Sequence, residues 1–78
     1  MLEARNIKEK NGNVIFALFI EGNHSPDPDA IVSFFPSSGK IETDRTLDYI
    51  KQDYVKKAVR KLSSYTPKYP ESFKMVWY

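Results

Sequence analysis

The apolar run Val14–Ile20 constrains the fold more than any other feature of the sequence. Its β-branched and aromatic residues are typical of a β-strand. Successive side chains of a strand point to opposite faces, so Phe16 and Leu18 point one way while Ile15 and Ala17 point the other. Because the run is far shorter than the roughly 20 residues of a membrane-spanning helix, we expect a strand that is apolar on both faces.

Turn signals divide the first part of the chain into two hairpins. Asn11-Gly12 predicts a tight turn, because both central residues of a type I′ turn need a positive φ. We expect the first hairpin over residues 2–20, with Lys10 paired to Asn13. A loop is expected at 21–29, where two prolines lack the amide hydrogen that a ladder needs. A second hairpin is expected over residues 30–43.

A regular register from the first turn fixes which residues share a face. The expected pairs on one face are Ile7 with Phe16, Arg5 with Leu18, and Glu3 with Ile20. On the other face, Ile15, Ala17 and Phe19 are expected beside Leu2 and Ala4.

Apolar residues at spacings of three and four predict an amphipathic helix over residues 46–65. The predicted buried stripe consists of Leu47, Ile50, Tyr54, Val55, Ala58, Val59, Leu62 and Tyr65. Thr46 or Asp44 is the expected N-cap. The helix should end before Pro67, since the residue preceding a proline is pushed out of the α region. An aromatic strand over residues 72–78 completes the chain.

The predicted order is therefore ββββαβ in a single domain, residues 1–78. The fold class is α+β, a mostly antiparallel sheet of about five strands with one long helix packed on it. The chain has 78 residues, 41% of them hydrophobic, and no cysteine. Disulfides, thiolate catalysis and cysteine-ligated metals are thus excluded. Without an apolar leader or spanning segment, we expect a cytoplasmic protein.

One helix covers only one face of a sheet, so the second apolar face needs another cover. Sheet curling, the loops and the C-terminal strand could provide it within one chain. Alternatively, a homodimer or a larger protein partner covers it. The candidate interface residues are Ile15, Ala17, Phe19, Ile31 and Phe35. We therefore predict a small non-enzymatic binding or accessory protein that acts through protein–protein contacts.

A basic helix face suggests an alternative, nucleic-acid binding. Residues 46–78 carry seven basic and three acidic side chains. Four of the basic residues share one arc of the helix: Lys56, Lys57, Arg60 and Lys61. Such a stripe could follow a phosphate backbone. However, cations near a helix C-terminus are also expected from the helix dipole, and Asp53 could pair with Lys56 and Lys57.

Other candidate chemistry is weak. The loop residues Glu21, His24, Asp27 and Asp29 could ligate a cation, but their spacing does not match a calcium loop. Asp44 and Asp48 could form a carboxylate pair, although caps explain them more simply. The final strand could add to a partner's sheet or complete the core. We assign no catalytic, cofactor-binding or metal residue, and no motif indicates a family.

Overall fold

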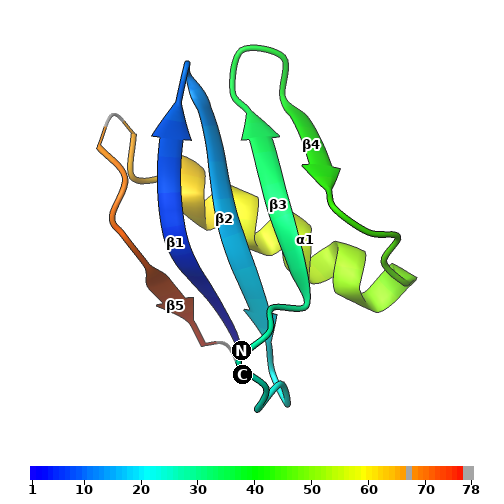
Figure 1. Cartoon of the computed structure of the whole chain (residues 1–78). Helices are drawn as coiled ribbons and strands as arrows, with labels where there is room; N and C mark the ends of the chain where they lie inside the picture. The colour runs from blue at the N-terminus through cyan, green and yellow to red at the C-terminus, as the bar shows by residue number, and fades with distance from the viewer. Residues whose placement is uncertain (67, 77–78) are drawn as a thin grey trace.

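A computed structural model, describing residues 1–66 and 68–76, contains a five-stranded antiparallel sheet with one helix against it (Figure 1). The elements are β1 (Leu2–Lys10), β2 (Asn13–Ile20), β3 (Ala30–Phe35), β4 (Lys40–Thr43), α1 (Tyr49–Ser63) and β5 (Phe73–Met75). The strands lie in the order β4-β3-β2-β1-β5. The expected α+β fold and the order ββββαβ are confirmed.

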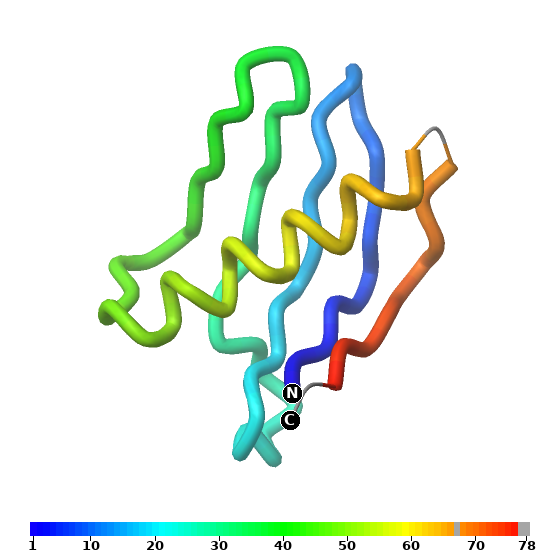
Figure 2. Tube along the Cα trace, turned by 180° about the vertical axis from the view of Figure 1, so that it is seen from behind, coloured from blue at the N-terminus to red at the C-terminus, as the bar shows by residue number. Residues whose placement is uncertain are grey.

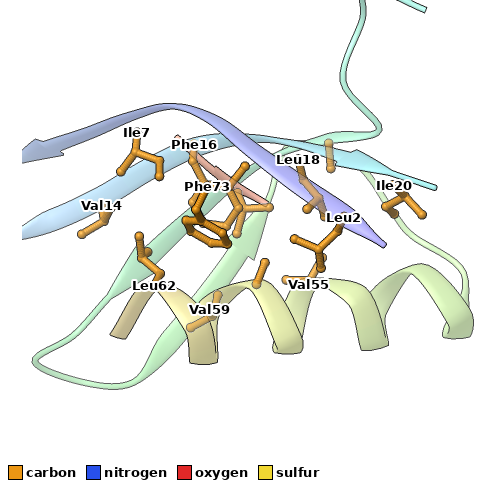
Figure 3. Packing of buried hydrophobic residues seen from close by; sticks show 14 of the residues in the cluster. Leu2, Ile7, Val14, Phe16, Leu18, Ile20, Val55, Val59, Leu62 and Phe73 are labelled. Atoms are coloured by element: carbon orange, nitrogen blue, oxygen red, sulfur yellow. The ribbon is translucent and has the colours of Figure 1, made fainter. Parts of the chain in front are cut away.

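The core lies between α1 and one face of the sheet, which we call the helix face (Figure 2). Val55, Val59 and Leu62 of α1 point toward the sheet (Figure 3). Opposite them, Phe16 at the centre of β2 is only 1% exposed. The strands contribute Leu2, Ala4, Ile7, Val14, Phe16, Leu18, Ile20, Ala30, Val32 and Phe73 to this core. The apolar alternation of β2 and β3 thus supplies most of one layer.

The register of β1 against β2 departs from the expected one at a β-bulge. Lys10 pairs with Asn13 as expected, and Lys8 with Ile15, but Arg5 pairs with Ala17. The two residues 6 and 7 therefore lie opposite Phe16 alone. Residue 6 is an asparagine with φ 57°, and asparagine tolerates this left-handed conformation better than most residues.

The bulge exchanges the faces expected for the first half of β1. Arg5 was expected beside Leu18 and Glu3 beside Ile20, but Ala4 pairs with Leu18 and Leu2 with Ile20. The expected pairing was wrong because a regular strand was assumed. Leu2 and Ala4 are consequently buried on the helix face, and Glu3 and Arg5 lie on the opposite face.

The helix is shorter than predicted, and its N-cap is Asp48 rather than Thr46 or Asp44. The Asp48 carboxylate accepts a hydrogen bond from the Lys51 amide at 2.9 Å. Asp44 does not cap the helix, because its carboxylate accepts from the Ile31 amide on β3. Ile50, predicted in the buried stripe, lies in the first turn and is 70% exposed.

The last strand is also shorter than predicted. β5 pairs with β1 through residues 73–75, and Phe73 is buried against Tyr65, with ring centroids 5.7 Å apart. The remainder of the predicted strand includes Trp77 and Tyr78, which lie outside the described residues. Within the described part of the chain, α1 is too short and too polar to cross a membrane.

Candidate functional site: the open face of the sheet

The sheet face turned away from α1 has no described helix or strand over it (Figure 1). We call it the open face. The cross-strand pairs place the five candidate interface residues there: Ile15, Ala17 and Phe19 on β2, Ile31 and Phe35 on β3. Their grouping on one face agrees with the sequence prediction. Their role as an interface stays a prediction.

The chain itself covers part of the open face. Ala17 and Phe19 are only 7% and 8% exposed. The Arg5 guanidinium lies over the Phe19 ring, 4.1 Å from its centroid, and pairs with the Glu3 carboxylate at 2.7 Å. The hydrogen bond from Arg5 lowers the pKa of Glu3 despite some desolvation. This cover was missed in the sequence because the bulge, which brings Arg5 to this face, was not anticipated.

An apolar strip nevertheless remains accessible on β2 and β3. Ile15 is 39% exposed, and Ile31 and Phe35 are half-buried. Ser33, also half-buried, lies directly opposite Ile15 in the neighbouring strand. The strip therefore alternates large side chains with small ones.

Two cross-strand rows run over the open face from β1 to the end of β4. The first row is Lys8, Ile15, Ser33 and Glu42. The second row is Arg5, Ala17, Ile31 and Asp44, the last joined to Ile31 by hydrogen bonds. Each row begins with a cation on β1 and ends with an acid on the β4 side. Outside these two rows the open face also carries Glu3 on the β1 side and Lys40 on the β4 side.

The charges of the second row are largely neutralised within the chain. Arg5 pairs with Glu3, as described above, and Arg45 pairs with the Asp44 carboxylate at 2.8 Å. The hydrogen bonds from Arg45, with a further one from the Ile31 amide, lower the pKa of Asp44 to about 2. In the first row, by contrast, Lys8 makes no ion pair with another described residue. Its charge remains available to a partner.

The basic helix face lies on the outward side of α1. Lys56 and Arg60 are exposed there, whereas Lys57 and Lys61 are half-buried. Lys57 pairs with Asp53 at 3.2 Å, as the sequence suggested. Lys61 lies over the Tyr65 ring, 5.4 Å from the centroid. The structure therefore brings the four cations together but uses two of them in contacts with neighbouring side chains.

Asp29 stabilises the loop of residues 21–29 by hydrogen bonds to the end of β2 and within the loop. Its carboxylate accepts from the Ile20 amide at 2.8 Å and from the Asn23 side chain at 2.9 Å, and Lys51 Nζ lies 3.5 Å away. Burial acts to raise the pKa of Asp29, but these hydrogen bonds and the charge of Lys51 outweigh it and lower the pKa. His24 is exposed. The described residues contain no group of three or more potential metal ligands.

Asp44 and Asp48, weighed above as a carboxylate pair, have separate structural roles. Asp44 joins the end of β4 to β3, and Asp48 caps α1. Both border open hollows between the β4–α1 connection and its neighbours; the one beside Asp44, of about 570 Å³, has Ile41 and Val55 in its lining. Asp44 lines one of these hollows and Asp48 the other.

Comparisons of the chain with protein-family models, curated proteins and solved structures find no match. The fold and surface chemistry therefore define the chain only as a small α+β domain with one covered and one open sheet face.

Proposed function

We propose that this protein acts by binding, through its open face, and that the partner at this face is a second copy of the chain. One observation carries the proposal: the apolar strip on β2 and β3 faces away from the only described helix. Ile15 is 39% exposed at its centre. A two-sided apolar strand is costly to keep in water, and sheet-on-sheet packing is the usual way to bury one.

The charges around the strip favour a copy of the same chain over a strongly charged partner. The ion pairs Arg5–Glu3 and Lys40–Glu42 lie on this face, at 2.7 and 3.5 Å. Cations and anions are thus interspersed, as a self-complementary surface requires. A nucleic-acid-binding surface would instead carry cations throughout.

The size of the face predicts a weak dimer. Four strands about 4.8 Å apart, with roughly six residues of β1, β2 and β3 and the four residues of β4 in contact, give a footprint of about 350 Å². Stable complexes bury about 800 Å² per partner. We therefore expect association at high micromolar rather than nanomolar concentration.

Sedimentation velocity of the full chain, from about 5 μM to about 1 mM, tests this proposal. We expect the average mass to rise toward that of a dimer. Ile15→Lys should keep the chain monomeric, because it places a charge in the strip. Ile50→Lys is the matched control, since Ile50 is 70% exposed on the helix; it should leave dimerisation unchanged. A wild-type chain that is monomeric at every concentration would overturn the proposal.

A second candidate function is nucleic-acid binding by the basic helix face. The observation that favours it is the exposure of Lys56 and Arg60 on the same outward side of α1. Neither makes an ion pair with another described residue. A phosphate backbone lying along the helix would meet both cations, and counterion release would make binding salt-dependent.

Titration of labelled single- and double-stranded oligonucleotides at several salt concentrations tests this second candidate. Binding that weakens with salt, and that is lost in Lys56→Glu/Arg60→Glu but kept in Lys10→Glu, would support it. Absence of binding at low salt would reject it.

A further inference from the structure

The open face has a pattern that fits a two-fold copy of itself in one orientation. Resting on the self-association proposed above, we propose that the dimer axis runs parallel to the strands, between β2 and β3. Rotation about this axis lays β1 over β4 of the partner and β2 over β3 of the partner. This rotation does not change the position of a residue along the strand direction; it only reverses the order of the strands. Each cross-strand row therefore faces the same row of the second copy, in reverse order.

Side-chain size supports this orientation. In the first row, Ile15 lies beside Ser33 within one chain; in the dimer, Ile15 lies over Ser33 of the second copy. In the second row, Ala17 and Ile31 are neighbours, and Ile31 comes over the second copy's Ala17. Each large side chain therefore meets a small one, which lets the two layers interdigitate.

Charge supports the same orientation. The reversal of the first row brings Lys8 over Glu42 of the second copy, and the two-fold axis makes this contact twice. Among the described residues, the Glu42 carboxylate makes an ion pair only with Lys40, at 3.5 Å, and both side chains are more than half exposed. An axis perpendicular to the strands would instead lay β1 over β1 and oppose Lys8 to Arg5, two cations. Like charges across an interface disfavour that alternative.

The distances are compatible with these contacts. Packed sheets lie about 10 Å apart, which an extended lysine and glutamate span together. Aligned sheets also cross at about −30°. The outer strands β1 and β4 lie roughly 7 Å from the axis. There, the crossing angle displaces facing residues along the strands by about 4 Å, close to the length of one residue. The pair Lys8–Glu42 at the margin of the strip stays within reach.

Complementary charge reversal tests the arrangement. Lys8→Glu alone opposes two acids at each contact, and Glu42→Lys alone opposes two lysines. We expect each variant to dimerise roughly tenfold more weakly than wild type. Mixed in equal amounts, the two variants should form a heterodimer, since both of its contacts again join an acid to a lysine. Sedimentation at low salt measures the masses, and circular dichroism verifies that each variant is folded.

Ser33→Leu provides an independent test of the size pattern. It adds apolar area to the face, so it would tighten any non-specific apolar contact. In the proposed dimer it fills the space that Ile15 of the second copy occupies, and we expect dimerisation to weaken about tenfold or more. Ser63→Leu changes an exposed serine at the end of α1, on the other side of the sheet; it is the matched control and should leave dimerisation unchanged.

The outcomes separate this inference from the proposed function. If wild type dimerises and Ile15→Lys does not, but the mixed variants associate no better than either alone, the axis is wrong while self-association through the open face stands. Tighter association of Ser33→Leu would overturn the axis in the same way. A monomeric wild type would overturn both.

Discussion

We expect Asp29 to contribute more to the free energy of unfolding than any other carboxylate in the described part of the chain. Its side chain is 13% exposed, and it fastens the 21–29 loop to the end of β2 through the Ile20 amide. Asp29→Ala leaves that amide without its acceptor, at a cost of about 1–3 kcal/mol. Loss of the contacts with Asn23 and Lys51 adds about 1 kcal/mol. The sum, about 3 kcal/mol, is a large part of the roughly 5–15 kcal/mol that holds a small domain together.

The isosteric change separates charge from hydrogen bonding. Asp29→Asn keeps an acceptor oxygen for the Ile20 amide but loses the charge, so we expect a loss of about 1 kcal/mol at pH 7. Folding lowers the pKa of Asp29. Its stabilising contribution is therefore fully present above the unfolded value of about 3.9 and is lost as the pH falls through the lower folded value. The difference between wild type and Asp29→Asn should shrink as the pH approaches 2.

Urea unfolding followed by circular dichroism, at a low concentration where the chain is monomeric, measures these differences. Asp53→Ala is the matched control, because Asp53 is 61% exposed and Lys57 is its one ion-pair partner among the described residues; we expect a change below about 0.5 kcal/mol. The reasoning fails if Asp29→Ala is as stable as this control. It also fails if the gap between wild type and Asp29→Asn is the same at pH 2.5 and pH 7.

Four further outcomes follow from the same geometry. Asn6→Val should cost about 2 kcal/mol in urea unfolding, since a β-branched residue resists positive φ, whereas Asn6→Gly should stay within about 0.5 kcal/mol of wild type. Phe16→Ala should cost about 3–5 kcal/mol by the same measurement. The Asp44 side chain is 37% exposed, so screening limits Asp44→Asn to less than about 1 kcal/mol, a difference that vanishes as the pH falls through its pKa of about 2. In the proposed dimer Lys10 and Lys40 of opposite copies approach each other at the hairpin tips, so Lys40→Glu should strengthen dimerisation about threefold in sedimentation.

Hydrophobic periodicity and turn signals were enough to predict the helix and strands, but not which side chains of β1 lie on which face of the sheet. The turn at Asn11-Gly12, the two-sided strand β2 and the helix are all local patterns, and each is present in the structure. The sequence around the bulge does carry a signal of it. Leu2 and Ala4 have even numbers and Ile7 an odd one, so a regular strand would place Ile7 on the face opposite to Leu2 and Ala4. The turn-prone Asn6 comes directly before Ile7. A strand can bring all three apolar side chains to one buried face only if it contains an extra residue, which is a β-bulge.

The first residue of the helix and the contact of Arg5 with Phe19 could not be predicted from local sequence patterns. Asp44, Thr46 and Asp48 are all good capping residues, so local preference does not choose among them. The choice depends on β3, whose Ile31 amide engages Asp44. Arg5 reaches Phe19 on the neighbouring strand only because the bulge turns Arg5 to the open face. Both outcomes depend on contacts between segments distant in sequence, which a single sequence does not specify.

The bulge and the open face are physically connected. In a regular strand, Arg5 and Lys8 are three residues apart and would point to opposite faces. The extra residue at Asn6 puts both cations on the open face while Ile7 joins Leu2 and Ala4 in the core. One backbone irregularity thus completes the core and builds the basic side of the cross-strand rows. If those rows guide dimerisation, the left-handed conformation of Asn6 matters for recognition as well as for folding.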